Sequence, residues 1–243
     1  MGEFGADFGH ELARELERVL PADLPRRTEL LAHAVRHAEL VLSANERLNL
    51  TRITTPRDVA VKHVYDSLLP WRRFIEFFPE DAAASKVAPG ESGISGARLL
   101  ADVGSGAGYP GILLAELLPR VRVLLIESTQ KKAAFLAETA KALRLENVEV
   151  HAVRAEALLA LRAVDVVTAR AVGSTRDLLR LLKPARANFR RLLLYKGRVA
   201  DAELELAQAA KDAEKLGQRG TITMRAALPD DAGERCVLEY SPP

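Results

Sequence analysis

The residues with the clearest chemical signature form a glycine-rich turn that follows a short apolar run. Residues 99–111 read LLADVGSGAGYPG and place four glycines within eight positions. Glycine permits tight turns and lets another molecule approach the backbone closely. Pro110 suits the start of a helix, where its missing N–H costs nothing. Because the free N–H groups and positive dipole of a helix start favour an anion, we expect this turn to bind a ligand.

Two classes of ligand fit the turn. Residues 106–111 read GAGYPG, which matches the dinucleotide pattern G-x-G-x-x-G literally. However, Asp102 ends the apolar run and leads directly into Gly104 and Gly106, as in the first motif of many S-adenosylmethionine-dependent methyltransferases. A carboxylate there suits the ammonium group of a methionine tail and would repel a pyrophosphate. We therefore predict that Asp102, Gly104 and Gly106 bind S-adenosylmethionine, and an NAD-linked oxidoreductase is the alternative.

Further polar residues follow the next three apolar runs. Glu127 ends the second run, where a carboxylate can accept hydrogen bonds from both ribose hydroxyls of either NAD or S-adenosylmethionine. Ala155 and Glu156 come after the third run, where an adenine edge would lie, and Arg170 ends the fourth. Since ligands bind at the carboxyl ends of the strands in open α/β sheets, we expect these residues to meet at one site.

Apolar runs that alternate with helical patterns must position these residues. Strands are expected at residues 99–103, 121–126, 148–153, 164–168, 192–195, 221–226 and 236–240. The first five read as continuous apolar runs, which indicates a parallel sheet with both faces covered. The last two flank a turn and predict an antiparallel hairpin. The expected fold is α/β and Rossmann-like: a class I methyltransferase with a mostly parallel seven-stranded sheet that ends in this hairpin.

Residues 1–78 are predicted to form an N-terminal helical region. Two apolar stripes recur there at helical spacing: Phe8, Leu12, Leu16, Val19 and Leu20, then Leu31, Val35, Ala38 and Leu42. We expect both helices, and Trp71, to pack against the rest of the protein. Residues 79–97 are rich in Ala, Ser, Gly and Pro, which is typical of a linker or long loop. The S-adenosylmethionine-binding methyltransferase domain is placed at residues 98–243.

A third N-terminal helix carries several polar residues that could do chemistry. Residues 55–58 read TPRD, with a capping Thr, a Pro at the first helical position and an acidic first turn. The helix continues through Lys62, His63, Asp66 and Ser67. The pairs Lys62/Asp66 and His63/Ser67 are four residues apart, so we expect them on or beside the exposed side of the helix.

Composition sets limits on the partners and the compartment. The 243 residues contain 35 Lys and Arg against 33 Asp and Glu, a net charge of +2 that supports a polyanionic partner only weakly. Cys236 is the only cysteine, so no intrachain disulfide can form and a reducing compartment fits. No metal site, signal peptide or transmembrane segment is expected. We predict a cytoplasmic monomer without a membrane partner.

Several motifs together resemble those of one known family. They are Asn49-Leu-Thr51, Lys62-His63-x-x-Asp66-Ser67, the turn D-x-G-x-G-x-G-x-P-G that begins at Asp102, and Tyr195-Lys196-Gly197. In this order they resemble the bacterial ribosomal RNA small-subunit methyltransferase G family, over residues 30–239. The resemblance implies methyl transfer from S-adenosylmethionine to N7 of a guanine in the decoding-region loop of 16S rRNA, in naked rRNA or in the small ribosomal subunit.

The resemblance also implies roles for individual residues. Cofactor binding carries over to Gly104, Tyr109, Ala155, Glu156 and Arg170. We assign RNA positioning to Asn49, Lys62, His63, Lys196 and Arg198. Guanine N7 presents a lone pair and carries no proton, so no indispensable catalytic residue is expected. A non-catalytic RNA-binding module is the second alternative.

This sequence departs from the family pattern at three places. Cys236 stands where the family usually has His, Tyr195 is an unusual aromatic residue before Lys196, and residues 79–97 form a long insertion. These differences bear on how RNA is contacted and leave the expected reaction unchanged.

Overall fold

The computed structural model describes residues 6–79 and 98–243, so most of the predicted linker at 79–97 lies outside the described residues. Its centre is a seven-stranded sheet of order β3-β2-β1-β4-β5-β7-β6, in which β7 runs antiparallel to both of its neighbours. The strands are β1 (Leu99–Val103), β2 (Arg122–Ile126), β3 (Val148–His151), β4 (Val164–Arg170), β5 (Phe189–Lys196), β6 (Arg219–Ala227) and β7 (Glu234–Ser241). The predicted fold class is confirmed, and the strand ends differ by a few residues.

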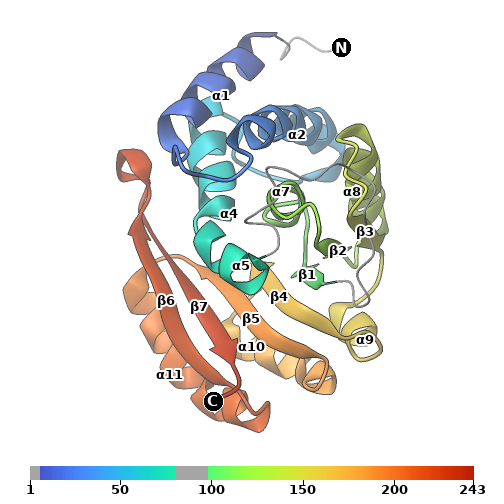
Figure 1. Ribbon diagram of the computed structural model, residues 1–243, viewed down its shortest axis with the longest axis vertical. Helices are drawn as coiled ribbons and strands as arrows, with labels where there is room; N and C mark the ends of the chain where they lie inside the picture. Colours follow the sequence, from blue (N-terminus) through green and yellow to red (C-terminus); the bar gives the residue numbers. More distant parts are fainter. Residues whose placement is uncertain (1–5, 80–97) are drawn as a thin grey trace.

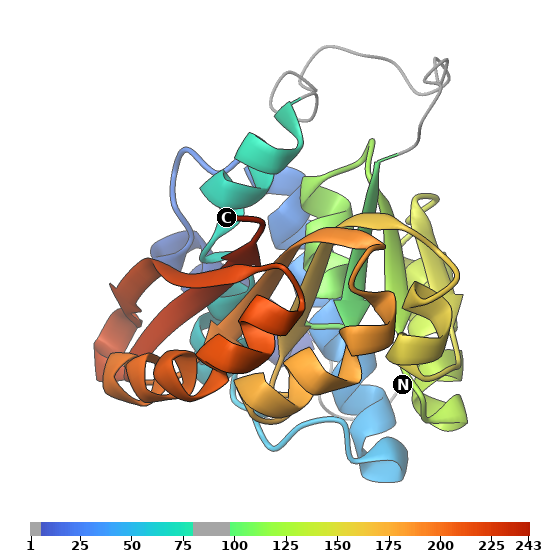
Figure 2. The same ribbon diagram turned by 90° about the horizontal axis from the view of Figure 1, so that it is seen from below.

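Helices cover both faces of the sheet (Figures 1 and 2). One face carries α7 (Gly111–Leu117) and α8 (Gln130–Ala142), and the other carries α9 (Ala155–Leu159), α10 (Thr175–Leu181) and α11 (Val199–Lys215). Neighbouring residues of β1 point to opposite faces, so Leu100 joins the first hydrophobic core and Ala101 the second. Burial on both faces explains why these strands read as continuous apolar runs.

The N-terminal helices pack onto the first core. They are α1 (Ala6–Val19), α2 (Arg27–Leu48), the continuous helix formed by α3 (Pro56–Asp58), η1 (Val59–Tyr65) and α4 (Asp66–Leu68), and α5 (Trp71–Phe77). Leu12, Leu30 and Phe74 lie in the same hydrophobic cluster as Leu113 of α7. Trp71 is buried, which confirms its expected core role. Residues 6–78 therefore share a core with the sheet.

The buried face of α2 is turned relative to the predicted stripe. Leu31 and Ala38 are buried as expected, whereas Val35 and Leu42 are only partly buried. The polar residue His37 is completely buried on the same face.

The prediction that four polar residues of the third helix lie on or beside its exposed side is wrong for three of them. Thr55 caps this helix as expected, since its Oγ1 accepts the N–H of Asp58 at 3.3 Å. His63, Asp66 and Ser67, however, are 8%, 3% and 0% exposed. Residues 59–65 form a π-helix, whose wider turn changes which side chains face the core. The expected pairing of residues 62 and 66 is also absent, because their side chains take other partners.

The sheet topology brings distant segments to one edge. The strand order reverses between β1 and β4, which is where ligands bind in open α/β sheets. The carboxyl ends of β1, β2, β4 and β5 share this side, and antiparallel β7 begins here because Cys236 pairs with Lys196. We call this side the carboxyl edge. It holds the glycine turn and the loop between β6 and β7.

Candidate active site at the carboxyl edge

The glycine turn is held in place by Asp102 and by close backbone packing. Asp102 ends its strand as predicted, and its Oδ2 accepts the N–H of Gly111 at 3.2 Å, at the start of α7. A Cβ on Gly111 would lie 2.6 Å from this oxygen and 2.3 Å from Leu125, so only glycine fits. Pro110 is the residue before α7 rather than its first residue.

The Asp102 carboxylate is enclosed by the protein. Its side chain is fully buried, and Oδ1 has no hydrogen-bond partner among the described residues. Burial raises the pKa of Asp102 to about 7, against the opposing effect of the bonds from Ser105 and Gly111. Oδ2 thus supports the turn, whereas Oδ1 is left without a donor, and the contact of Asp102 with a methionine ammonium stays a prediction.

Glu127 connects the glycine turn to the end of β2. Its Oε2 accepts the N–H of Gly106 at 3.1 Å, and its Oε1 accepts the N–H of Thr129 at 2.8 Å. Each carboxylate oxygen can accept a second hydrogen bond. The residue is therefore placed at the carboxyl edge with acceptor capacity to spare, as a role toward ribose hydroxyls requires.

The predicted adenine-side residues also lie at this edge. Ala155 is buried at the start of α9, and Glu156 follows it in the first turn. Within residues 6–79 and 98–243, Oε2 of Glu156 is buried without a hydrogen-bond partner, like Oδ1 of Asp102. Buried acceptors without donors suit a ligand that carries N–H and O–H groups. S-adenosylmethionine offers an ammonium, two ribose hydroxyls and an adenine amino group, so the residues present fit this cofactor.

Tyr109 is packed inside the protein rather than open to a ligand. Its ring lies between His37, at a centroid distance of 4.4 Å, and His63, at 4.5 Å and 9° from parallel. The side chain is 5% exposed, and its hydroxyl has no hydrogen-bond partner in the part of the chain that the structure describes. Little of the ring is accessible in this structure, and the assignment of Tyr109 to cofactor binding stays a prediction.

His37 ties α2 to the glycine turn. Its Nε2–H donates to the carbonyl of Ala107 at 2.8 Å. Burial lowers the pKa of His37 to about 4, so the ring is neutral at pH 7. Gly108 has a φ of 95°, and a Cβ there would lie 2.9 Å from Nε2 of His37. Glycine is needed at this position both for its backbone angle and for the histidine beside it.

Arg170 is the centre of a buried polar network. Its guanidinium donates to Oδ2 of Asp66 at 3.0 Å, to the carbonyl of Lys62 at 3.1 Å and to Nδ1 of His63 at 3.2 Å. It also lies over the ring of Tyr109, 5.6 Å from the centroid. The predicted position of Arg170 at the end of β4 is confirmed, and the network links it to the N-terminal helices.

The hydrogen bonds of this network show which nitrogen of His63 carries the proton. Since Nδ1 accepts from Arg170, the proton is on Nε2, which donates to Oγ1 of Thr51 at 2.8 Å. Burial, followed by the charge of Arg170, lowers the pKa of His63 to about 3. His63 is 8% exposed and neutral, so it offers RNA little surface of its own, and its assignment to RNA positioning stays a prediction.

Other residues of this network were not among the predicted site residues. Asp66 forms ion pairs with both Arg170, at 3.0 Å, and Arg235, at 3.1 Å. The hydroxyl of Tyr195 donates to the carbonyl of Ser67 at 2.8 Å. The spacing of Asp66 within the Lys-His-x-x-Asp-Ser motif could have indicated its role, because an acidic residue next to buried apolar positions needs a cationic partner.

The two predicted basic residues at the end of β5 differ in accessibility. Lys196 is largely covered and its Nζ lies 2.7 Å from Glu205, while Arg198 is 76% exposed and pairs with Asp201. Cys236, opposite Lys196, is buried, and its thiol lies 3.6 Å from the carbonyl of Gly197. The residue that replaces the usual histidine of the family is thus internal.

The two remaining predicted RNA residues lie on the N-terminal helices. Asn49 is exposed and ends α2 with a φ of 49°. Lys62 is 35% exposed and pairs with Asp58 at 2.7 Å. Both are accessible, and the backbone carbonyl of Lys62 is bound to Arg170.

The strand order, the antiparallel β7, the glycine turn after β1 and the carboxylate after β2 define a class I methyltransferase that uses S-adenosylmethionine. Comparison with known families then identifies the group. The model of the rRNA small subunit methyltransferase G family matches residues 30–227. The chain belongs to this family.

Similar proteins agree with this assignment. The ribosomal RNA small subunit methyltransferase G of Solibacter usitatus is 43% identical over 221 residues, which are 91% of this chain and 95% of that protein. The protein of the same name from Sorangium cellulosum is 42% identical over 193 residues, 78% of this chain and 72% of its own length. Family membership decides the choice of cofactor in favour of S-adenosylmethionine over NAD.

Solved structures share the fold at low sequence identity. The METTL16 methyltransferase domain covers 97% of this chain and 92% of its own, with a TM-score of 0.55 and 14% identity. Magnesium protoporphyrin IX methyltransferase from Synechocystis, solved with bound SAM, covers 85% and 97% with a TM-score of 0.52 and 14% identity. Among the described residues, no helix has the length and apolar character needed to span a bilayer.

Proposed function

We propose that this protein methylates N7 of a guanine in the decoding-region loop of 16S rRNA. The observation that carries the proposal is the family match, which includes the glycine turn, Glu127 and Arg170. We further propose a cytoplasmic protein that acts as a monomer on rRNA or on the small ribosomal subunit.

The side chains at the carboxyl edge are consistent with a reaction that needs no general base. Guanine N7 has a lone pair and no proton to remove. His37 and His63, the two histidines beside the turn, are buried, neutral and bonded to other groups of the protein. Catalysis then consists of holding the guanine in line with the methyl group.

The cofactor supplies an activated methyl group bonded to a sulfonium sulfur. In this proposal Glu127 binds the ribose hydroxyls and Glu156 accepts from the adenine side. Asp102 maintains the turn, and the network of Arg170, His63 and Asp66 fixes the wall of the site that faces the N-terminal helices.

Methyl transfer to RNA tests the proposal directly. Purified protein is incubated with methyl-labelled S-adenosylmethionine and either naked 16S rRNA or 30S subunits that lack the modification, and the modified base is mapped. We expect one labelled guanine that shows N7 chemistry. Binding without methyl incorporation would favour a non-catalytic RNA-binding module, and label at a different atom or base would overturn the assigned target.

A further inference from the structure

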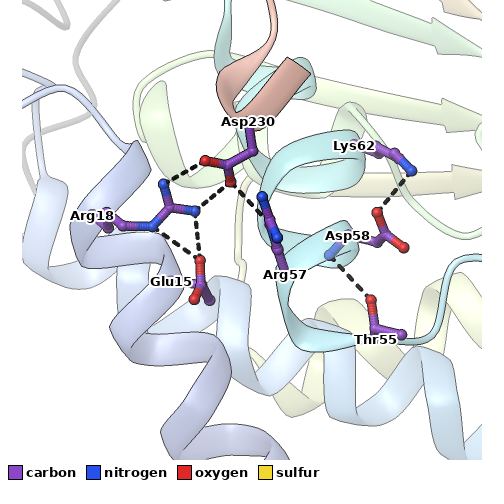
Figure 3. Close-up of polar contacts among 7 residues, drawn as sticks. All are labelled: Glu15, Arg18, Thr55, Arg57, Asp58, Lys62 and Asp230. Atoms are coloured by element: carbon purple, nitrogen blue, oxygen red, sulfur yellow. Dashed lines mark hydrogen bonds and ion pairs between the residues drawn. The ribbon is translucent and has the colours of Figure 1, made fainter. Parts of the chain in front are cut away.

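Four charged side chains form a chain of contacts at the surface of the carboxyl edge (Figure 3). Arg18 of α1 donates hydrogen bonds to Glu15. It also forms a bidentate contact with Asp230, in which Nη1 donates to Oδ1 at 3.0 Å and Nη2 donates to Oδ2 at 2.5 Å. Oδ2 of Asp230 also accepts from Nε of Arg57, in α3, at 3.1 Å. The contacts therefore join three segments that are far apart in the sequence.

The cluster lies on the same side of the sheet as the glycine turn. Asp230 belongs to η4 (Pro229–Asp231), in the loop between β6 and β7. This loop directly precedes the end of β7 at which Cys236 pairs with Lys196. Three strand steps separate β7 from β1, which is about 14 Å at the usual strand spacing. An RNA that places one base at the glycine turn can extend along this edge toward the loop.

The two arginines in the cluster have different roles. Arg18 uses Nε, Nη1 and Nη2 on two carboxylates. Arg57 uses only Nε on Asp230, and within residues 6–79 and 98–243 its terminal nitrogens meet no acceptor. The Arg57 side chain is 63% exposed, and the neighbouring Asp58 is occupied by Lys62 at 2.7 Å. Arg57 thus keeps four N–H donors available.

Arg57 is held in position at both its backbone and its side chain. The Thr55 cap on the N–H of Asp58 fixes the helical turn that contains Arg57. Asp230 fixes the guanidinium through Nε and has a φ of 59°, a left-handed backbone angle that few residues other than glycine adopt. An arginine whose guanidinium is already oriented loses less conformational entropy when it binds the oxygens of a phosphate.

A role in stabilising the fold alone does not account for the contact between Arg57 and Asp230. The bidentate contact between Arg18 and Asp230 already joins α1 to the loop, and exposed ion pairs add little stability. The additional contact to Arg57 adds an oriented and accessible cation at the edge where the substrate must bind.

We propose that Arg57 binds a backbone phosphate of the RNA substrate, with Asp230 and Arg18 as its positioning residues. This inference rests on the proposed function, because it assumes an RNA substrate. The two arginines hold the pKa of Asp230 below its usual range, with the hydrogen bond from Arg18 as the main cause, so the carboxylate is ionised at neutral pH.

The test measures RNA affinity as a function of salt. In-vitro transcribed 16S rRNA is bound to wild type, Arg57→Gln, Asp230→Asn and the control Arg122→Gln. Arg122 is 48% exposed and pairs with Glu149 at 2.7 Å, at the amino end of β2 on the opposite side of the sheet. For Arg57→Gln we expect roughly three- to tenfold weaker binding and a slope of log K against log salt that is smaller by about 0.7.

Asp230→Asn tests whether Asp230 orients Arg57 for RNA binding or only stabilises the fold. Asp230→Asn should weaken RNA binding by a smaller factor than Arg57→Gln, and both should raise KM for RNA with little change in kcat. Affinity for S-adenosylmethionine should remain that of wild type in both. Because Arg57 is exposed, its variant carries the test even where Asp230→Asn lowers stability.

Two outcomes would overturn the inference. One is Arg57→Gln behaving like Arg122→Gln in affinity and salt slope. The other is tighter RNA binding by Asp230→Asn, which would mean that the carboxylate competes with RNA for the arginines. If wild type neither binds nor methylates the rRNA, the proposed function itself fails, and the two failures are thereby distinguished.

Discussion

Arg170 donates a hydrogen bond from Nη2 to Nδ1 of His63 at 3.2 Å, although both side chains belong to basic residue types. This contact requires a neutral imidazole with its proton on Nε2. The Nε2–H then donates a hydrogen bond to Oγ1 of Thr51 at 2.8 Å. The histidine thus orients the arginine at the end of β4 from a helix more than a hundred positions earlier in the chain.

Replacement of His63 should therefore disturb Arg170. His63→Leu removes the acceptor for Arg170 and the donor to Thr51, and we expect a loss of about 1–3 kcal/mol in the free energy of unfolding. Affinity for S-adenosylmethionine should fall as well. His63→Asn, which can keep an acceptor near the position of Nδ1, is the matched control and should retain more of the affinity in calorimetric titration. Equal cofactor affinity in wild type and His63→Leu would contradict the orienting role.

Glu127→Gln should weaken cofactor binding by an order of magnitude or more. The amide has only one acceptor oxygen, so it cannot accept from both Gly106 and Thr129 and still bind ribose hydroxyls. The exposed Glu138 of α8 provides the control, as Glu138→Gln should leave affinity unchanged. Isothermal titration with S-adenosylmethionine measures both variants, and wild-type affinity in Glu127→Gln would remove Glu127 from the binding site.

The stability of the cofactor-free protein should carry a pH dependence from Asp102. Its folded pKa of about 7 lies above the value of 3.8 for the free side chain. Because the folded state binds the proton of Asp102 more tightly than the unfolded state does, Asp102 adds to the free energy of unfolding in full below about pH 4. This contribution is lost as the pH rises through about 7. At about 1.4 kcal/mol per pH unit, the change amounts to roughly 4 kcal/mol. Urea unfolding from pH 4 to 8 should show it in wild type and not in Asp102→Asn; parallel curves would disprove it.

Tyr195→Phe should lower stability and leave chemistry nearly unchanged. The hydroxyl donates to the carbonyl of Ser67 in a buried region, so its removal leaves that acceptor unpaired. We expect a cost of about 1–2 kcal/mol in the free energy of unfolding. Thermal or urea unfolding measures the cost, and methylation rates below the melting transition should match wild type. A large fall in rate with unchanged stability would show a direct role in RNA contact.

Much of the fold could be predicted from the sequence because its signals are local. The continuous apolar runs indicated the parallel strands, and the TPRD segment indicated the helix start at Thr55. The glycine turn with Glu127 after the next strand located the candidate site, and the structure brings these residues together by the bond from Gly106.

The orientation of the third helix could not be predicted, because helical periodicity assumes a regular helix. The π-helical turn at residues 59–65 changes the face that is buried, and the partners of Asp66 come from Arg170 and Arg235, far along the chain. A polar residue is buried when distant residues satisfy it, and single-chain spacing does not carry that information. The same reason explains why the packing of Tyr109 against His37 and His63 could not be predicted.

The hydrogen bond from His37 to the carbonyl of Ala107 couples the stability of α2 to the stability of the glycine turn. Any ligand that stabilises the glycine turn also stabilises the helix that holds it, since binding to the folded state alone favours the whole cooperative unit. Local opening of α2 must then become rarer when the cofactor binds, and amide hydrogen exchange in α2 should slow although the helix lies outside the sheet. An enzyme shortened to the sheet and its covering helices would lose this support and, with it, the shape of the turn.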